Sequence, residues 1–278
     1  MSTSKQPNTK LLTGIPRSGT TLCCKLLNQC GNTLALHEPI NPQKLTSVTP
    51  VTAASEIKSQ IQQIRHSLMS NQAIEHGDKA GVDLDNPIGL GTNETGLRLQ
   101  KATRGLVTLP TIDNTTGLYI KQNALFAALA EPLTANFDMF AIIRNPVDVL
   151  LSWMTVDLPV NKGRLPAGEK FDKRLAELLR KVPSVIERQI TIYSWFVSRY
   201  QSADLTTIRY EDIIQSQGQA LYGPLGLNNT TELSIPQRTF SREVLQSITS
   251  QLMRIKVIGN QAGYDDEFMM ERVESLSL

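Results

Sequence analysis

A glycine-bounded loop between two apolar segments is the feature of this chain that most constrains its fold. Residues 14–21 read Gly-Ile-Pro-Arg-Ser-Gly-Thr-Thr, directly after Leu11 and Leu12 and directly before residues 22–27, whose apolar side chains have helical spacing. A strand, such a loop and a helix in this order gather backbone N–H groups around an anion at the N-terminus of the helix. The pattern therefore predicts a phosphate-binding loop at the end of the first strand of an α/β protein.

The loop departs from the ATP-binding form at one position. A Walker A loop has Lys before its Ser or Thr, so that the ammonium reaches the β- and γ-phosphates while the hydroxyl holds Mg²⁺. Here Thr20 stands where that lysine belongs, and the cation has moved to Arg17. Such a loop is poorly suited to a nucleoside triphosphate, but it can hold a shorter phosphate chain without a metal. The alternative is an ordinary glycine-rich turn.

The composition indicates one domain whose anion site is local. A chain of 278 residues can bury one substantial core, alone or with an inserted lid. Its 28 Lys and Arg residues nearly balance its 26 Asp and Glu residues, and the net charge is about +2. A balance this even provides no general attraction for nucleic acid or an anionic membrane, so neither partner is expected.

Cysteine usage and the lack of long apolar runs bear on the compartment. The chain has three cysteines, Cys23, Cys24 and Cys30. Because their spacing fits neither a metal site nor a disulfide framework, we expect them to be reduced and mostly buried. Residues 1–10 lack the apolar segment of a signal peptide, and no run of 18 apolar residues occurs. These features favour a soluble, cytoplasmic protein without a membrane span.

Apolar runs and helical periodicities alternate along the rest of the chain. After the first strand, the expected strands are Thr33–Leu36, Leu118–Lys121, Asp138–Ile143 and 205–209, and the expected later helices are 53–76, 124–130, 146–156, 168–181, 184–201 and 240–257. This alternation predicts an α/β fold, an open parallel sheet of the P-loop type flanked by helices, in a single domain covering residues 1–278.

Two stretches fall outside the alternation. Residues 1–9 are expected to be disordered. Residues 77–117 are rich in Gly, Asn, Asp and Thr with little periodicity, which is typical of a lid or a binding loop. Together with the helix at 53–76 they form an expected insertion over 40–117 on the substrate side of the sheet.

A second polar segment follows the strand that ends at Ile143. Asn145 as N-cap, Pro146 at the first helical position and Asp148 two residues later predict a helix start. Arg144 then lies at the carboxyl edge of the sheet and Ser152 about two turns into the helix, so both could reach one phosphate. The alternatives are a surface salt bridge for Arg144 and a helix-packing hydroxyl for Ser152.

Together, the two segments resemble the sulfotransferases that use 3′-phosphoadenosine 5′-phosphosulfate (PAPS). The resemblance implies that the loop Pro16, Arg17, Ser18, Gly19, Thr20 and Thr21 holds the 5′-phosphosulfate, and that Arg144 and Ser152 hold the 3′-phosphate. The segment 208–212 resembles the family's Tyr-Glu-Asp, which places Tyr210 beside the adenine, and Gly263-Tyr264 resembles a closing Gly-Tyr pair. The similarity covers most of the sheet but leaves out the middle loop.

Within that family the local pattern resembles the carbohydrate type. Leu26-Leu27-Asn28-Gln29 and then Glu38-Pro39 follow the loop in the order of that type. The small-phenol and steroid type has a tryptophan after the Thr-Thr pair, where this chain has Leu22, and a Lys-Thr-His base segment, where it has Lys121-Gln122-Asn123. The expected acceptor is therefore a hydroxyl on a sugar or a small metabolite.

Sulfonyl transfer to a hydroxyl needs a base and an anion clamp. His37 and Glu38 end a strand before Pro39 and so lie at the ligand-binding edge of the sheet. Glu38 is the first candidate for the base and His37, with its ordinary pKa near 6.5, the second. Because adjacent strand residues point to opposite sides, only one of the two is expected to face the substrate. An exposed acidic residue before proline is the alternative.

The expected clamp is Arg17 with the amides of residues 18–21. Lys121, at the end of another strand, is a second cation or else a solvated strand end. Arg254 and Lys256 could contact the 3′-phosphate, although a charged helix face accounts for them better. No metal is expected, because the histidines are scattered and the clamp neutralises the charge. Two other functions stay open: a P-loop kinase or NTPase, disfavoured by Thr20, and an inactive nucleotide-binding module.

Overall fold

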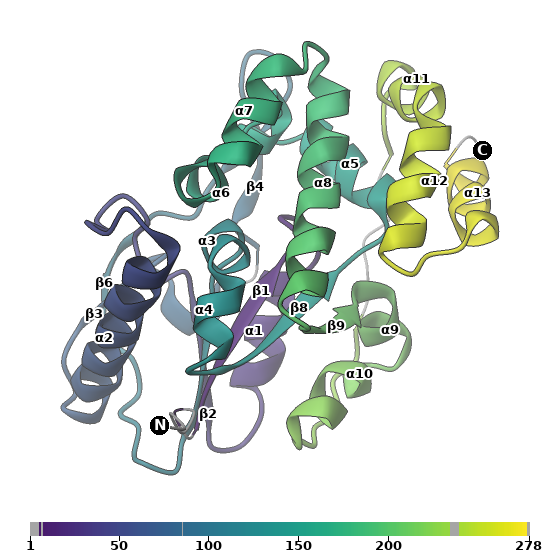
Figure 1. The fold of residues 1–278 in the computed structure, drawn as a ribbon. Coiled ribbons are helices and arrows are strands. Elements are labelled where there is room, and N and C mark those ends of the chain that lie inside the picture. The colour runs from purple at the N-terminus through teal and green to yellow at the C-terminus, as the bar shows by residue number, and fades with distance from the viewer. Residues whose placement is uncertain (1–5, 7, 85, 234–238, 277–278) are drawn as a thin grey trace.

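The computed structural model describes residues 6, 8–84, 86–233 and 239–276, and its centre is a five-stranded sheet in the order β2-β7-β1-β8-β9 (Figure 1). The strands are β1 (Thr9–Gly14), β2 (Thr33–His37), β7 (Gly117–Lys121), β8 (Asp138–Ile143) and β9 (Thr206–Arg209). Every neighbouring pair in this sheet is parallel. The predicted α/β fold with an open parallel sheet is confirmed.

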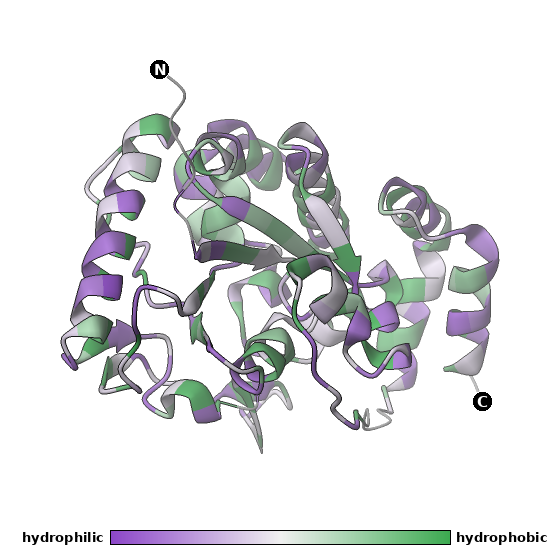
Figure 2. Ribbon diagram, turned by 90° about the horizontal axis from the view of Figure 1, so that it is seen from below, coloured by the Kyte–Doolittle hydropathy of each residue, from purple (hydrophilic) through white to green (hydrophobic). Residues whose placement is uncertain are grey.

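Alternation along the strands assigns their side chains to two cores. On β1, Leu11 contributes to the core on one face of the sheet and Leu12 to the core on the other, and both are fully buried. On β8, Ala141 and Ile142 divide between the faces in the same way. Strands buried on both faces read as continuous apolar runs, which is why the sequence alone located them (Figure 2 shows the largely hydrophobic strands).

Helices cover both faces. One face carries α1 (Thr20–Asn28), α9 (Tyr210–Gln215) and α10 (Gln219–Tyr222). The other carries α2 (Pro50–Met69), α3 (Ala124–Ala128), α4 (Ala130–Thr134), α5 (Pro146–Met154), α8 (Val185–Ser202) and, at its end, α11 (Arg242–Ser250), α12 (Leu252–Gln261) and α13 (Asp266–Ser275). The C-terminal helices α11 to α13 stand together at one side of the molecule, beyond β9 (Figure 1).

The first long helix ends earlier than its periodicity predicts. The helix predicted at 53–76 is α2, whose N-cap Thr49 accepts a hydrogen bond from the Thr52 N–H and which ends at Met69. Asn71 has a left-handed φ of 54°, so the chain turns there, and Ile74–His76 forms the strand β3 instead. The buried side of α2 includes Ile57 and Ile61, which lie four residues apart and so share one face of the helix.

Three other predicted helices are each divided in two. The segment 168–181 splits at Asp172 into α6 (Pro166–Phe171) and α7 (Lys173–Lys181), because the Asp172 carboxylate caps α7 at the Leu175 N–H and also accepts from the Trp195 indole. The segment 124–130 splits at Leu129 into α3 and α4, and the segment 240–257 splits at Gln251 into α11 and α12. The helix α13 was not predicted.

The expected irregular loop at 77–117 has secondary structure of its own. Strand β3 (Ile74–His76) pairs with β6 (Gly105–Val107), and β4 (Ile88–Thr92) pairs with β5 (Arg98–Gln100), both antiparallel. The Arg98 N–H donates to the Thr155 carbonyl at 3.1 Å, and the Asp157 N–H donates back to the Arg98 carbonyl at 2.9 Å. Backbone hydrogen bonds of this kind fix the insertion against the end of α5, which short-range sequence patterns do not encode.

Strand order places the two predicted polar segments side by side. The chain passes from β1 to β2 on one side of the sheet and later returns to β8 on the other side of β1. Ligands bind in open α/β sheets outside the carboxyl ends of the strands at such a reversal. The loop at 14–21 follows β1 and the segment at 144–152 follows β8, so both meet at this point.

The cysteine prediction is also confirmed. Cys23, Cys24 and Cys30 are buried and free. Burial raises the pKa of all three thiols, that of Cys24 to about 12. Among the residues that the structure describes, no helix combines the length and apolarity needed to cross a bilayer. Residues 1–9 are predicted to be disordered, but most of them lie outside the residues that the structure describes. Thr9 is the first residue of β1.

Candidate active site

The loop between β1 and α1 can be built only with glycine at two of its positions. A Cβ on Gly14 would lie 2.8 Å from the Ile142 carbonyl oxygen, and one on Gly19 would lie 2.3 Å from the Tyr210 ring. Gly19 also has a left-handed φ of 92°. Arg17 is left-handed too, at φ 72°, although it has a side chain. Such strain in a non-glycine residue is typical of functional sites.

Hydrogen bonds from neighbouring elements hold the loop in place. The Trp153 indole N–H donates to the Pro16 carbonyl at 2.8 Å. The Ser18 hydroxyl donates to the Ile142 carbonyl, and the Ser18 N–H donates to the Ile15 carbonyl, both at 2.9 Å. Both donors of Ser18 are therefore engaged, the hydroxyl by β8 and the N–H within the loop. Of the amides predicted to bind an anion, those of Gly19, Thr20 and Thr21 stay candidates.

The N-terminus of α1 is open to an anion. Its N-cap is Gly19, which provides no side-chain hydrogen bond, and its first turn contains no acidic residue. The first N–H groups of a helix have no acceptor within the helix, and the helix dipole places positive charge there. Thr20 and Thr21 line a cleft at this end of the helix. The local structure therefore favours binding of a negatively charged group.

The second segment presents Arg144 to the same cleft. The Tyr193 hydroxyl donates to the Arg144 carbonyl at 2.7 Å, and the Arg144 guanidinium lies 4.4 Å from the centre of the Tyr210 ring. Asn145 caps α5 as predicted, with its side chain accepting from the Asp148 N–H at 2.9 Å. The alternative of a surface salt bridge holds only in part: Arg144 pairs with Asp148 at 3.3 Å, but both side chains are mostly covered.

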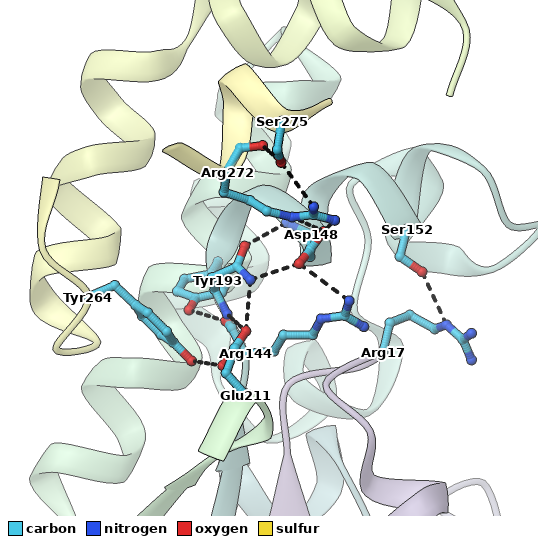
Figure 3. A network of polar contacts seen from close by, with 10 residues as sticks. Arg17, Arg144, Asp148, Ser152, Tyr193, Glu211, Tyr264, Arg272 and Ser275 are labelled. Carbon is cyan, nitrogen blue, oxygen red and sulfur yellow. Dashed lines mark hydrogen bonds and ion pairs between the residues drawn. The ribbon is translucent and has the colours of Figure 1, made fainter. Parts of the chain in front are cut away.

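The two segments are in direct contact. The Arg17 Nε donates to the Ser152 hydroxyl at 3.3 Å, as Figure 3 shows. Ser152 is buried and is not among the residues that line the cleft, whereas Arg17 and Arg144 both are. Its contact with Arg17 indicates a role in orienting that guanidinium, and the predicted direct contact with a phosphate stays a prediction.

On the other side of β1, an acidic and a basic side chain form an ion pair. His37 and Lys121 are partners in the register of β2 and β7, and Glu38 follows His37 with a left-handed φ of 49°. The Lys121 ammonium lies 2.6 Å from a Glu38 carboxylate oxygen, with 3% of the lysine side chain and 35% of the glutamate side chain exposed. Lys121 is therefore no solvated strand end.

Charge and burial act in opposite directions on Glu38. Burial alone would raise the pKa of this carboxyl, but the neighbouring Lys121 ammonium outweighs it and holds the pKa at about 2. Glu38 is consequently ionised at neutral pH. A carboxylate with so low a pKa is a weak base while Lys121 remains its partner.

His37 is a buried neutral imidazole. Burial, and then the charge of Lys121, lower its pKa to about 3, so the ordinary value predicted for it is wrong. Its backbone N–H donates to the His76 Nε2 at 2.8 Å, which fixes the proton of His76 on Nδ1, 2.7 Å from the Asp78 carbonyl. His37 and Glu38 both line the cleft, contrary to the expected alternation, because the chain leaves the strand geometry at Glu38.

A single cleft of about 850 Å³ joins these groups. On the side of β1, β8 and β9 it is lined by Pro16, Arg17, Gly19, Thr20, Thr21, Arg144 and Tyr210, and on the side of β2 and β7 by His37, Glu38 and Lys121. The rest of the lining combines aliphatic residues, among them Pro42, Ile88, Leu125, Leu158 and Leu165, with the polar residues Asn86, Gln100, Gln122, Asn123 and Arg164. Ile88 comes from the insertion, and Leu158 and Leu165 come from the segment after α5.

Some supporting residues were missed by sequence reasoning. The Glu211 carboxylate accepts from the Asn145 N–H at 3.1 Å and from its side-chain amide at 2.7 Å, and the Tyr264 hydroxyl donates to Glu211 at 2.7 Å. Glu211 lies in the segment 208–212 and Tyr264 in the pair Gly263-Tyr264, so the resemblance in the sequence already pointed to both residues. Arg272, which binds Asp148, had no such signal.

Two basic residues of α12 lie apart from the cleft. Arg254 pairs with Glu187, and Lys256 lies 3.4 Å from Asp266. Neither lines the cleft. Both contacts fit the charged helix face that the sequence favoured over a contact with a 3′-phosphate. Among the described residues, no group of three or more His, Cys, Asp or Glu side chains could hold a metal ion.

Comparison with known proteins adds a distant likeness of fold. No family model and no curated protein matches the sequence. Among solved structures, the chain is similar to the sulfotransferase domain from the curacin biosynthetic pathway, with 17% identity over 87% of this chain and 78% of that chain and a TM-score of 0.43. An identity this low does not transfer an activity, which has to be argued from the site.

Proposed function

We propose that this protein is a sulfotransferase that moves the sulfonyl group of PAPS to a hydroxyl acceptor. The observation that carries the proposal is the pair of cations, Arg17 and Arg144, which two separate segments bring to one cleft beside Glu38 and Lys121. One phosphate chain would need only one of these arginines. A donor with phosphates at both its 5′ and 3′ positions would use both.

The donor would lie across β1, β8 and β9. Its 5′-phosphosulfate would accept hydrogen bonds from Arg17 and from the amides at the start of α1, where the helix dipole also favours an anion. Its 3′-phosphate would bind Arg144, and its adenine would lie beside Tyr210, whose ring packs against Gly19. The left-handed Gly19 makes room for that ring.

The chemical step needs one bond to form and one to break. The acceptor oxygen bonds to sulfur, the bond between sulfur and the bridging phosphate oxygen breaks, and that oxygen takes the electron pair. Arg17 and the α1 amides stabilise the charge that develops on it. The proton of the acceptor hydroxyl passes to Glu38, or to His37 if the acceptor approaches from that side.

Lys121 links the two halves of this step. In the free protein its charge makes Glu38 a weak base. The phosphosulfate brings negative charge next to this pair and draws on the same ammonium, which weakens the hold of Lys121 on Glu38. The pKa of Glu38 then rises toward its ordinary value, so that the base becomes effective when the donor is bound.

The cleft walls bear on the acceptor. A sugar needs several polar partners, and the cleft offers Asn86, Gln100 and Arg164 beside aliphatic side chains such as Ile88, Leu158 and Leu165. The ring of Tyr210, which lines the cleft, lies on the side proposed for the donor and not on the side of the acceptor. Both acceptors predicted from the sequence, a sugar and a small metabolite, therefore stay proposals, because these walls offer hydrogen-bonding groups as well as aliphatic surface.

The decisive experiment is a transfer assay combined with nucleotide binding. The protein is incubated with PAPS and separate panels of aliphatic alcohols and sugars, and sulfated products are measured by mass spectrometry. We expect transfer without added metal and tighter binding of 3′-phosphoadenosine 5′-phosphate (PAP) than of ATP. Mg²⁺-dependent ATP turnover with no preference for PAP would favour a P-loop kinase or NTPase. Tight PAP binding without transfer to any acceptor would favour an inactive nucleotide-binding module.

A further inference from the structure

Two arginines share the carboxylate of Asp148. Arg272, on α13, contacts one carboxylate oxygen through Nη2 at 2.7 Å and Nε at 3.1 Å. The other oxygen accepts from the Asn145 side-chain amide at 2.8 Å and lies 3.3 Å from Nη2 of Arg144. Figure 3 shows Asp148 between the two guanidinium groups. The contact of Arg144 is the longest of the four.

Arg272 changes the balance of charge around the Asp148 carboxylate. Burial alone would raise the pKa of Asp148, but the charge of Arg144 and hydrogen bonds from Arg272 and Asn145 lower it, so the carboxylate is ionised. With Asp148 negative, Arg144 alone would form a neutral pair with it. Arg272 gives Asp148 a second positive partner, so the carboxylate no longer cancels the charge of Arg144 alone. More of the charge of Arg144 is then available to an anion in the cleft.

Arg144 is held by the carboxylate only loosely. Its Nε is buried and has no hydrogen-bond partner among the described residues, and its guanidinium stacks on Tyr210. An arginine that formed a close two-pronged pair with Asp148 would turn away from that ring and from the cleft. Because Arg272 and Asn145 already satisfy the carboxylate, Arg144 can stay on Tyr210.

The position of Arg272 is fixed by the packing of α13. Met269, on the same helix and one turn earlier, is fully buried against α12, where a Cβ on Gly259 would lie 2.1 Å from its sulfur. Tyr264, just before α13, is anchored to Glu211, which in turn holds Asn145. The helix is thus held against α12 by Met269 and, through Tyr264 and Glu211, tied to the segment that carries Arg144.

We propose that Arg272 is a positioning residue of the donor site, which holds Asp148 so that Arg144 keeps its charge and direction for the 3′-phosphate. This inference rests on the proposed function, because the latter assigns the 3′-phosphate to Arg144. Arg272 itself is not among the residues that line the cleft, so it acts through Asp148.

The test compares binding of PAP with binding of AMP, which lacks the 3′-phosphate, by calorimetry. In Arg272→Ala we expect PAP affinity to fall about 10-fold while AMP affinity stays within about two-fold, because only the 3′-phosphate loses a charge-assisted partner. Adding Asp148→Asn to this variant should restore most of the PAP affinity, since an amide does not compete for Arg144. Arg272→Lys should keep an intermediate affinity.

A matched control separates positioning from helix docking. Asp266→Ala removes an ion pair with Lys256 and a hydrogen bond from Asn260, which also hold α13, but it does not touch Asp148. We expect its preference for PAP over AMP to be that of the wild type. If Arg272→Ala does not fold, the double variant and Arg272→Lys carry the comparison.

The outcomes distinguish the proposed 3′-phosphate site from the positioning role of Arg272. A wild-type protein that binds PAP no better than AMP contradicts the proposed 3′-phosphate site itself. If the wild type prefers PAP and the Arg272 variants keep that preference, the positioning role is wrong and the site stands. Equal losses for PAP and AMP would also overturn it, because they indicate a merely structural helix.

Discussion

The two halves of the cleft differ in how their charges are arranged. On the side of β1 and β8, Arg17 and Arg144 are oriented by neutral or shared partners, Ser152 and Asp148, and the half remains net positive. On the side of β2 and β7, Lys121 and Glu38 neutralise each other. In the proposed function, the first half binds the anionic donor and the second half provides the base Glu38 with its cationic partner Lys121. Binding and turnover should therefore respond to different substitutions.

The largest effect is expected from Glu38→Gln. Loss of a general base costs about 10²- to 10⁴-fold in turnover. The affinity for PAP should not fall, because Arg17 and Arg144 are intact and Lys121 no longer shares its charge with Glu38. Steady-state kinetics with calorimetry of PAP binding measure the two effects separately. Glu75→Gln, which removes an exposed partner of Lys44 in β3, is the control and should leave both unchanged. Full activity of the Glu38 variant would transfer the role to His37.

Arg17→Ala and Arg144→Ala should reverse this pattern. Each removes one charge-assisted contact worth about 1.5–3 kcal/mol, so donor affinity should fall about 10- to 100-fold in either variant. Only the Arg144 change should erase the preference for PAP over AMP. Arg180→Ala, on the exposed side of α7, serves as control. If both variants bound PAP like the wild type, anion binding would not belong to the half of the cleft beside β1 and β8.

Low pH should lower the stability of the protein through His37 and Glu38, which lie in the half of the cleft beside β2 and β7. The pKa of His37 lies at about 3 in the folded protein instead of 6.5, so the unfolded chain binds the extra proton and stability falls as the pH drops from about 6.5 toward 3. By pH 5 the loss amounts to about 1–2 kcal/mol. Glu38, with its pKa of about 2 instead of 4.5, adds a loss only below about pH 4.5.

Urea unfolding at pH 7 and pH 5 measures this loss. His37→Gln should reduce the difference in unfolding free energy between the two pH values. His66→Gln, at an exposed position of α2, should leave the difference as it is. An unchanged pH dependence in the His37 variant would show that His37 does not titrate in this range.

The smallest effect concerns the backbone of the donor half. Arg17 occupies a left-handed conformation that glycine adopts without strain, so Arg17→Gly should be about 0.5–1 kcal/mol more stable than Arg17→Ala. Both variants lose the same guanidinium and should bind donor equally poorly. Thermal unfolding of the pair isolates the backbone contribution, and equal melting temperatures would argue against strain at this position.

The donor half could largely be predicted from the sequence. The loop at 14–21 and the helix start at Asn145 are contiguous segments, and their capping residues and glycines act within a few positions. The buried strands were equally clear because they are apolar on both faces. Local chemistry of this kind is written in neighbouring residues, so a pattern suffices to find it.

The other half and the supporting contacts could not be predicted in this way. Three of these features join residues far apart in the chain. They are the ion pair of Lys121 with Glu38, the contact of His37 with His76 of β3, and the ion pair of Arg272 with Asp148. Capping by Asp172, which divides a predicted helix, depends on Trp195 of another helix. Such features follow from packing, which periodicity does not record.

The buried cysteines have a practical consequence for measuring this protein. Because Cys23, Cys24 and Cys30 are covered and their thiols are hard to ionise, a single cysteine introduced on the surface would be the preferred site of a thiol-reactive dye. The exposed turn at Asn114 and Thr115 precedes β7 and lies at the end of the sheet opposite the cleft. A fluorophore placed there would report on unfolding, or tether single molecules, without entering the chemistry.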